Sequence, residues 1–220
     1  MKQRVLQAIH RFNRAHPWEH NAHYHPWIMR RLPRQFGAAL DVGCGSGDLA
    51  RLLATRAEVV DGFDADPQII AVARERTCPS ARVSFLVGDA LTDIPPGSYD
   101  DVITCVAAVH HLPFTDAIDL FRRRLAPGGT LVIVGLYDEC TFGDYLFGAA
   151  SVPLNLAMGW LKNTPRRAPR PASVAARSRP AEMTFSEIAS DARTALPGVR
   201  LRRRLFWRYT LVWHQPLLDP

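Results

Sequence analysis

The chain has 220 residues, of which 47% are hydrophobic and 22% are charged, so it can bury a full core but has no room for a large second domain. Its formal net charge is +6 at pH 7, which by itself would suit an anionic partner such as nucleic acid. Only Lys2 and Lys162 are lysines, so the excess is nearly all arginine, and charge alone does not identify a partner.

The N-terminal segment, residues 1–34, is expected to form a helical lid. Its first 16 residues are charged and carry apolar side chains at helical spacing, which predicts an amphipathic helix and no secretory signal. The four cysteines form no C-x-x-C pair; they are Cys44, Cys78, Cys105 and Cys140. We therefore expect reduced thiols in a cytoplasmic protein, with neither a disulfide framework nor a zinc site.

Hydrophobic runs then alternate with helical patterns over a core at 35–137, as is typical of βαβ winding. Strands are expected at 38–42, 58–64, 83–89, 100–105 and 129–135. Helices are expected at 47–56, at 67–76 with Pro67 in its first turn, and at 115–125. With two more strands near the C-terminus, the pattern predicts an α/β fold: a doubly wound, mostly parallel, seven-stranded Rossmann-like sheet with helices on both faces.

The alternation breaks at a predicted insertion, 138–182. Residues 142–161 are long and apolar but contain Asp144 and Pro153, so a spanning helix is a poor fit; we expect a helical lid or substrate wall and leave membrane-surface contact open. A basic, proline-rich loop follows. The last segment, 183–220, should complete the sheet with a helix from a capping box at 184–187 and two strands whose turn carries no clear signal.

The most informative segment is LDVGCGSGDLA, residues 40–50, where a strand runs through three glycines into a helix. Gly43, Gly45 and Gly47 allow a tight turn and close approach of a ligand to the backbone. Ser46 could cap the helix and direct its free N–H groups at an anion. The junction therefore predicts a cofactor cradle for a ligand that carries negative charge or lone pairs.

Two cofactor classes use such a junction. Gly45, Gly47 and Ala50 fit the dinucleotide fingerprint, with Asp64 near the expected ribose offset, but this match alone is weak. The decisive feature is a series of runs in order: EVVDGFD, VSFLVGDA, YDDVITCVAAVHHL and LAPGGTLVIVGLY. Over about residues 38–137 this series resembles the successive motifs of class I S-adenosylmethionine-dependent methyltransferases. The resemblance favours that cofactor over a nicotinamide.

The resemblance implies cofactor-binding residues at the strand ends, namely Asp41, Gly43, Gly45, Gly47, Asp64, Ala65, Asp89, Ala90, Cys105 and Val106. The glycine loop would hold the methionine part, with Asp41 ordering the loop and reaching the amino group through water. Asp64 would accept hydrogen bonds from both ribose hydroxyls, since a carboxylate offers two acceptor oxygens. Asp89 would accept a hydrogen bond from the adenine amino group. Asp66 stands where the family often has a hydroxyl residue. Each aspartate could instead be a helix cap or turn residue.

The methyl acceptor should approach at the carboxyl ends of the strands. The expected walls are rich in large side chains, namely Trp18, Tyr24, Trp27, Phe114, Tyr137, Phe142, Tyr145, Phe147 and Trp160. Such a lining suits a small apolar or aromatic acceptor, such as a secondary metabolite, quinone or lipid-like molecule, although these residues could simply cover the sheet.

Methyl transfer needs alignment and a dry cavity, and a base only where the acceptor must lose a proton. His111 is the first candidate base and His110 the second, although a His-His pair here also serves packing in the family. Tyr24 and His25 are further candidates to touch cofactor or acceptor. His20, His23 and His25 lack a carboxylate or cysteine at a familiar spacing, so no metal site is predicted.

Some acceptors are disfavoured. The Asn/Asp-Pro-Pro-Tyr turn of enzymes that methylate exocyclic nucleobase amines or glutamine amides is missing, because that place contains CVAAVHH. A duplex-DNA reader would need a recognition domain that has no room here. Two alternatives stay open: an RNA or protein methyltransferase that uses Arg166, Arg167 and Arg170, and a non-catalytic partner protein that binds the cofactor. The oligomeric state cannot be predicted.

Overall fold

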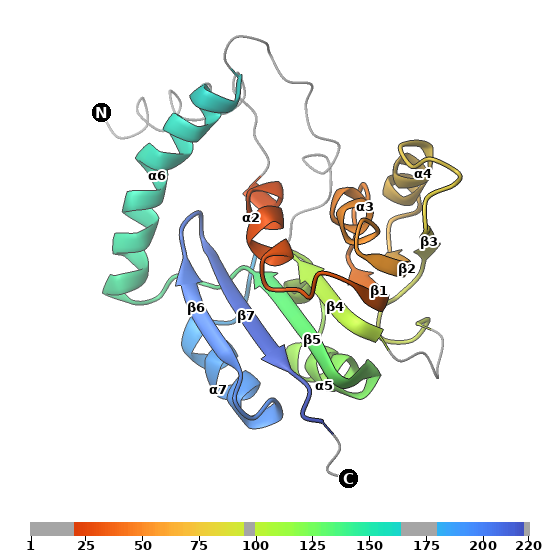
Figure 1. Ribbon diagram of the computed structural model, residues 1–220. Coiled ribbons are helices and arrows are strands. Elements are labelled where there is room, and N and C mark those ends of the chain that lie inside the picture. Colours follow the sequence, from red (N-terminus) through yellow and green to blue (C-terminus); the bar gives the residue numbers. More distant parts are fainter. Residues whose placement is uncertain (1–19, 95–99, 164–179, 218–220) are drawn as a thin grey trace.

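The computed structural model describes residues 20–94, 100–163 and 180–217. Seven strands form one sheet in the order β3-β2-β1-β4-β5-β7-β6, as Figure 1 shows. Their bounds are β1 Phe36–Val42, β2 Ala57–Asp64, β3 Val83–Val87, β4 Asp100–Val106, β5 Leu125–Gly135, β6 Arg200–Arg204 and β7 Arg208–His214. The first five are parallel, whereas β7 is antiparallel to both β5 and β6. The predicted doubly wound, mostly parallel sheet is confirmed.

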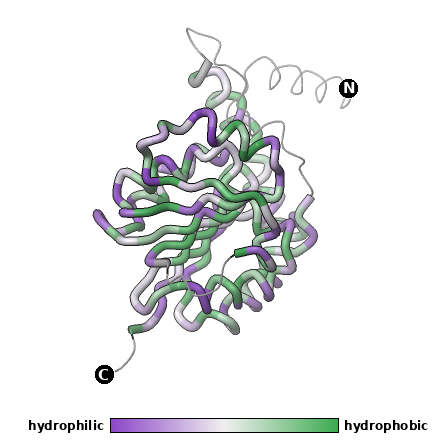
Figure 2. The backbone as a smooth tube through the Cα atoms, turned by 90° about the vertical axis from the view of Figure 1, so that its right-hand side faces the viewer, coloured by the Kyte–Doolittle hydropathy of each residue, from purple (hydrophilic) through white to green (hydrophobic). Residues whose placement is uncertain are grey.

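Helices cover both faces of this sheet (Figure 1). Helices α5 (Phe114–Arg124) and α7 (Phe185–Ala195) share one hydrophobic cluster with the sheet, whereas α2 (His20–Met29), α3 (Asp48–Leu53) and α4 (Pro67–Glu75) share the other. Strand β5 contributes to both, because alternate side chains of a strand point to opposite faces. Leu131 and Ile133 face one cluster, and Val132 and Val134 the other. Figure 2 shows the apolar central strands enclosed by more polar elements.

The connection pattern places the ligand crevice. Strand β1 pairs with both β2 and β4, and the chain winds outward in opposite directions from this point. Open parallel sheets bind ligands outside the carboxyl ends of their strands at such a reversal. Val42, the last residue of β1, lies beside Phe63 of β2 and Cys105 of β4. The loops after these three strands therefore meet at one edge of the sheet.

Several element ends differ from the sequence predictions. Strand β3 ends at Val87 instead of residue 89, because the chain turns at Asp89, whose carboxylate accepts from the amide of Leu91. Helix α3 ends at Leu53 instead of residue 56, and α5 begins at Phe114 after Pro113 instead of at residue 115. The capping box that starts α7 at Thr184 is confirmed, with Glu187 as its second member.

The β6–β7 hairpin explains why its turn could not be recognised in the sequence. Phe206 and Trp207 have φ angles of 61° and 58°, a left-handed region that bulky side chains rarely adopt. Tight hairpin turns usually use glycine, asparagine or aspartate at such positions. Phe206 is buried, and its backbone amide donates to the hydroxyl of Ser151 over 2.9 Å. Tertiary contacts therefore hold a turn that local sequence preference would not form.

The apolar segment after β5 is a helix, α6 (Phe142–Asn163), with Pro153 inside it. It stands beside the edge strand β6 and extends beyond the sheet, as Figure 1 shows. None of its residues belongs to either hydrophobic cluster. Among the described residues, no helix is long and apolar enough to cross a membrane. The predicted N-terminal helix at 1–16 and the arginines at 166, 167 and 170 lie outside the described residues.

Candidate active site

A cavity of about 740 Å³ opens at the carboxyl ends of the first four strands. Its lining comes from the strand ends and the segments that follow them: 42, 43 and 45 at β1, 63–69 at β2 and the start of the next helix, 88–90 after β3, and 106–108 with 111–112 at β4. Asn21 of α2 also lines it. Of the predicted cofactor-binding residues, the cavity brings together Gly43, Gly45, Asp64, Ala65, Asp89, Ala90 and Val106. Asp41, Gly47 and Cys105 lie outside this lining, and Asp41 and Cys105 are buried.

The glycine loop needs glycine for two different reasons. Gly43 has a φ angle of 69°, and a Cβ there would lie 2.1 Å from the Cβ of Ala108, so the loop after β1 packs directly against the loop after β4. Gly45 has a φ angle of 53°, and a Cβ there would meet nothing within 4 Å. This open space lies at the cavity. The loop therefore exposes bare backbone at the cavity.

The amide groups of the loop after β1 donate to the protein itself. Those of Gly43 and Cys44 donate to the carbonyl of Phe63 over 2.7 and 3.0 Å, and that of Gly45 donates to the carboxylate of Asp64 over 2.9 Å. These groups bind the end of β2 and are not aimed at an anion. Ser46 does not cap α3 either, because its hydroxyl donates to Asp48 over 2.7 Å while Gly47 holds the N-cap position.

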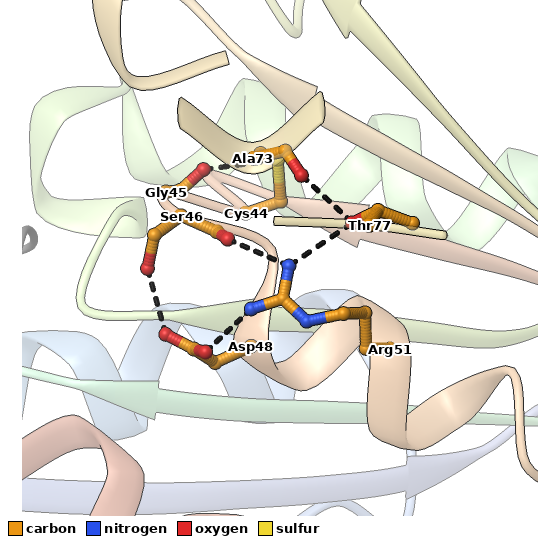
Figure 3. Close-up of polar contacts among 7 residues, drawn as sticks. All are labelled: Cys44, Gly45, Ser46, Asp48, Arg51, Ala73 and Thr77. Carbon is orange, nitrogen blue, oxygen red and sulfur yellow. Dashed lines mark hydrogen bonds and ion pairs between the residues drawn. The ribbon is translucent and has the colours of Figure 1, made fainter. Parts of the chain in front are cut away.

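A polar network around Arg51 holds the glycine loop in place (Figure 3). The guanidinium of Arg51 donates to the carbonyl of Ser46 over 3.0 Å and to the hydroxyl of Thr77 over 3.1 Å, and it pairs with the Asp48 carboxylate. The Thr77 hydroxyl in turn donates to the carbonyl of Ala73 over 2.7 Å. Arg51 thus ties the loop to the end of α4. The sequence analysis did not single out this residue.

Asp41 is a buried carboxylate next to the loop. One oxygen accepts a hydrogen bond from the Thr104 hydroxyl over 2.7 Å, whereas the other, Oδ2, has no partner among the described residues. Burial raises the pKa of Asp41 to about 7, against the lowering effect of Thr104 and with a smaller raising effect from Asp64. A buried acceptor without a donor is costly. A cationic ligand beside the loop would satisfy it, which fits the ammonium of an amino-acid moiety.

The two strand-end aspartates combine structural bonds with spare acceptor capacity. Asp64 accepts from Gly45 on one oxygen and from the amide of Asp66 over 3.0 Å on the other. Asp89 accepts from the amide of Leu91 over 2.8 Å. A carboxylate has about four lone-pair sites, so both keep acceptors for a ligand in the cavity. Asp66 caps α4 through Gln68, with Pro67 in the first turn, as predicted.

The loop after β4 forms the remaining wall. Ala107 has a φ angle of 53°, which is uncommon for a residue with a side chain, and its amide donates to the carbonyl of Val134 over 2.7 Å. A short 3-10 helix, η1 (Val109–His111), follows and places His111 at the cavity. The rings of His110 and His111 lie 4.0 Å apart between centroids, but His110 is not among the described lining residues.

The arrangement agrees with known proteins. Residues 39–129 match a family described as a methyltransferase domain. The chain is a class I S-adenosylmethionine-dependent methyltransferase. A Mycobacterium bovis protein named an uncharacterized methyltransferase is 29% identical over 206 residues, which cover 91% of this chain and 98% of that protein. The trans-aconitate 2-methyltransferase of Streptomyces avermitilis is 34% identical over 116 residues, 49% of this chain and 43% of that enzyme.

A solved structure supports the fold of this methyltransferase. A chain of the complex between the Haloferax volcanii Trm112 methyltransferase activator and a methyltransferase superposes with a TM-score of 0.60 and 20% identity. The match covers 89% of this chain and 91% of that chain. At this identity the likeness concerns the fold alone. The cofactor of the methyltransferase is S-adenosylmethionine.

Two predicted catalytic residues of the methyltransferase are not at the cavity. Tyr24 and His25 are buried in α2, and the Tyr24 hydroxyl donates to the carbonyl of Leu205 over 2.6 Å. Burial raises the pKa of Tyr24 to about 12, although Arg208 and Arg204 act against it, so this hydroxyl stays protonated. Burial also lowers the pKa of His25, with Asp48 acting in the opposite direction. The structure gives both side chains a packing environment.

The predicted aromatic walls are also elsewhere. Tyr24, Phe114 and Tyr137 are buried in the core, whereas the aromatic residues of α6 are exposed. None of the predicted wall aromatics is among the described residues that line the cavity, and Trp18 lies outside the described residues. The lining of this cavity therefore does not indicate an aromatic acceptor. The described residues contain no group of three His, Cys, Asp or Glu side chains that could hold a metal ion.

Asn21 is a cavity residue that sequence analysis missed. Its side-chain oxygen accepts a hydrogen bond from the Arg208 guanidinium over 3.1 Å, which links α2 to strand β7. Burial lowers the pKa of Arg208 to about 10, with Tyr24 acting in the opposite direction. With its oxygen held by Arg208, Asn21 has its amide N–H groups available to orient toward the cavity. No local signal marks this residue, because only the packing of α2 against the hairpin brings it there.

Proposed function

We propose that the methyltransferase transfers the methyl group of S-adenosylmethionine to a small acceptor in this cavity. One observation carries the proposal: the glycine loop, Asp64, Asp89 and His111 all line one space of about 740 Å³. This volume lies in the range of small-molecule sites. Because the cofactor must occupy much of it, the room left beside His111 suits a small acceptor better than a macromolecular segment.

The residues proposed to bind the cofactor follow from their free acceptors. Asp64 would accept the two ribose hydroxyls with the lone pairs that Gly45 and Asp66 leave, and Asp89 would accept the adenine amino group. Asp41 Oδ2 would face the ammonium end, directly or through water. Ala65, Ala90 and Val106 would contact the adenine and methionine parts. When bound, S-adenosylmethionine supplies an electrophilic methyl group on a sulfonium.

The acceptor would then lie against the loop after β4. Ala108 and Leu112 offer apolar contacts, and His111 and Asn21 offer polar ones. We therefore infer an acceptor with an apolar part and a polar group to be methylated. The trans-aconitate 2-methyltransferase, which is similar over 49% of this chain, acts on a small molecule by its name. This likeness supports a small acceptor without identifying it.

His111 is proposed as the base that removes the acceptor proton. His111 lines the cavity, and a ring nitrogen of histidine can accept the proton of a hydroxyl or amine as that atom is methylated. His110 packs against His111 and would hold its ring orientation. An acceptor that carries no proton at the methylated atom would need only alignment and exclusion of water.

The test is a methyl-transfer screen with labelled S-adenosylmethionine and fractionated cell extracts. Label in the small-molecule fraction, absent with Asp64→Ala, supports the proposal. Label in the RNA or protein fraction would replace it with the macromolecular alternative. Cofactor binding by calorimetry without label in any fraction would indicate a non-catalytic partner protein.

We also infer a cytoplasmic, reducing location, since Cys44, Cys78, Cys105 and Cys140 are all free thiols.

A further inference from the structure

Helix α6 presents polar and small residues to the protein. Its buried positions recur every three or four residues, as expected for one face of a helix. They are Asp144, Gly148, Ser151, Asn155 and Gly159. Not one of these side chains is a large hydrophobe, although burial of apolar side chains is what usually attaches a helix to a globular domain. The face that contacts the protein is therefore the polar face.

Specific polar contacts attach this face to the β6–β7 hairpin and to α2. The Asp144 carboxylate pairs with the Arg203 guanidinium over 2.8 Å. The Ser151 hydroxyl accepts from the amide of Phe206, and the Asn155 side-chain oxygen lies 2.7 Å from His20 Nε2. These contacts lie at three successive levels along the helix. They fix which side of α6 faces away from the protein.

The opposite face is apolar throughout. Its large exposed side chains are Phe142, Tyr145, Leu146, Phe147, Leu154, Trp160 and Leu161. Alanines, glycine and Pro153 fill the exposed positions between them, and Asp144 on the buried face is the one charged residue of 142–161. A helix exposed to water normally carries charged residues on its outer face. The polarity of α6 is thus the reverse of that of a surface helix in a soluble domain.

The width of this face identifies the kind of surface that it fits. At 3.6 residues per turn, the exposed positions cover an arc of about 200° around the helix. A helix that docks in a protein groove uses a narrower stripe, repeated at i, i+3, i+4 and i+7. An apolar arc this wide, without a charge, fits the acyl region of a lipid bilayer. Small and polar residues on the protein-facing side are also typical of helices that pack in lipid.

Charge around α6 favours an anionic membrane. The neighbouring edge strand β6 reads RLRRR, with four arginines and no acidic residue, and Arg200 and Arg202 are exposed. Basic residues beside an apolar helix attract anionic headgroups. We propose that α6 lies in the surface of an anionic lipid bilayer, with its apolar arc in the acyl boundary and β6 facing the headgroups. This proposal is independent of the identity of the methyl acceptor.

The experiment is vesicle flotation of the full chain with a matched pair of variants. Leu154 on α6 and Leu52 on α3 are helical leucines that are 42% and 40% exposed. We expect wild type and Leu52→Asp to float with vesicles of phosphatidylcholine and phosphatidylglycerol, with weaker binding to phosphatidylcholine alone. Leu154→Asp should bind the mixed vesicles at least about tenfold more weakly, because a charge at this depth opposes burial in lipid.

Four outcomes would overturn the proposal. Failure of wild type to float with either kind of vesicle would reject a lipid surface. Equal flotation of Leu154→Asp and Leu52→Asp would show that α6 is not the contact. If sedimentation velocity without lipid shows a dimer that Leu154→Asp dissociates, the apolar face binds a second copy of the chain. If Leu154→Asp, but not Leu52→Asp, lowers the melting temperature without lipid, the face packs against the chain itself.

Discussion

The amide of Gly45 donates to the carboxylate of Asp64 over 2.9 Å, and this bond joins the glycine loop after β1 to the end of β2. The two positions lie 19 residues apart in sequence, yet they line the same cavity. Asp64 therefore has two tasks in the proposed site: it orders the loop and keeps lone pairs for a ribose. Its removal should affect both.

Asp64→Ala should weaken the binding of adenosylhomocysteine by about 1.5 to 3 kcal/mol, the usual cost of leaving hydrogen-bonding groups without partners. Titration calorimetry measures this directly. Asp119→Ala, at a partly exposed position on α5 away from the cavity lining, serves as the control and should bind as wild type does. An affinity unchanged by Asp64→Ala would remove the ribose assignment.

Asp41 should make the stability of the free protein depend on pH. Because burial raises the pKa of its folded form from 3.8 to about 7, the folded protein holds a proton that the unfolded chain releases near pH 4. The contribution of Asp41 to stability is then full below about pH 4 and declines as the pH rises through about 7. Asp41→Asn, which stays neutral, should gain in melting temperature relative to wild type from pH 5 to pH 8. A constant difference would contradict this.

Ligand affinity should show the opposite trend. If the ionised Asp41 faces the ammonium of the ligand, adenosylhomocysteine should bind wild type more tightly as the pH rises through about 7. Below that pH the Asp41 carboxyl is protonated in the free protein and must release its proton when the ligand binds, which costs affinity. In Asp41→Asn this part of the pH dependence should disappear. Calorimetry at several pH values compares the two slopes, and parallel slopes would separate Asp41 from the ammonium.

His111→Ala should lower kcat while leaving the affinity for adenosylhomocysteine nearly unchanged, because a base acts in the transition state. His110→Ala should have a smaller effect, since His110 is not among the described residues that line the cavity. Steady-state kinetics with the acceptor found in the label screen provide the measurement. Equal turnover of wild type and His111→Ala would take this histidine out of the mechanism.

Arg51 should act on the cofactor only through the loop that it supports. Arg51→Ala removes the bonds to the Ser46 carbonyl and the Thr77 hydroxyl, so we expect weaker cofactor binding by about 1 to 2 kcal/mol and faster amide exchange of the loop. Arg122→Ala, at an exposed ion pair, is the matched control. Wild-type affinity and exchange in Arg51→Ala would show that the loop keeps its shape without this network.

The cofactor half could be predicted because its signals are local. Apolar runs end at Asp64 and near Asp89, and glycines follow β1, so the period and the turn residues place these groups at one sheet edge. The acceptor half depends on tertiary packing. Asn21 reaches the cavity only because α2 packs on a hairpin whose turn residues, Phe206 and Trp207, have unfavourable backbone angles. The apolar run at 142–161 predicts a helix, but not its outward apolar face, because only contacts show which side is buried.

Tyr24 illustrates the same limit and gives the last prediction. Its aromatic ring and its place in a lid suggested contact with cofactor or acceptor, whereas the structure has its hydroxyl donating to the Leu205 carbonyl at the hairpin. Tyr24→Phe should therefore cost about 1 kcal/mol of stability, or roughly 2 to 4 °C in melting temperature for a chain of this size. Its kcat and cofactor affinity should equal those of wild type. A large fall in kcat at unchanged melting temperature would return Tyr24 to the catalytic site.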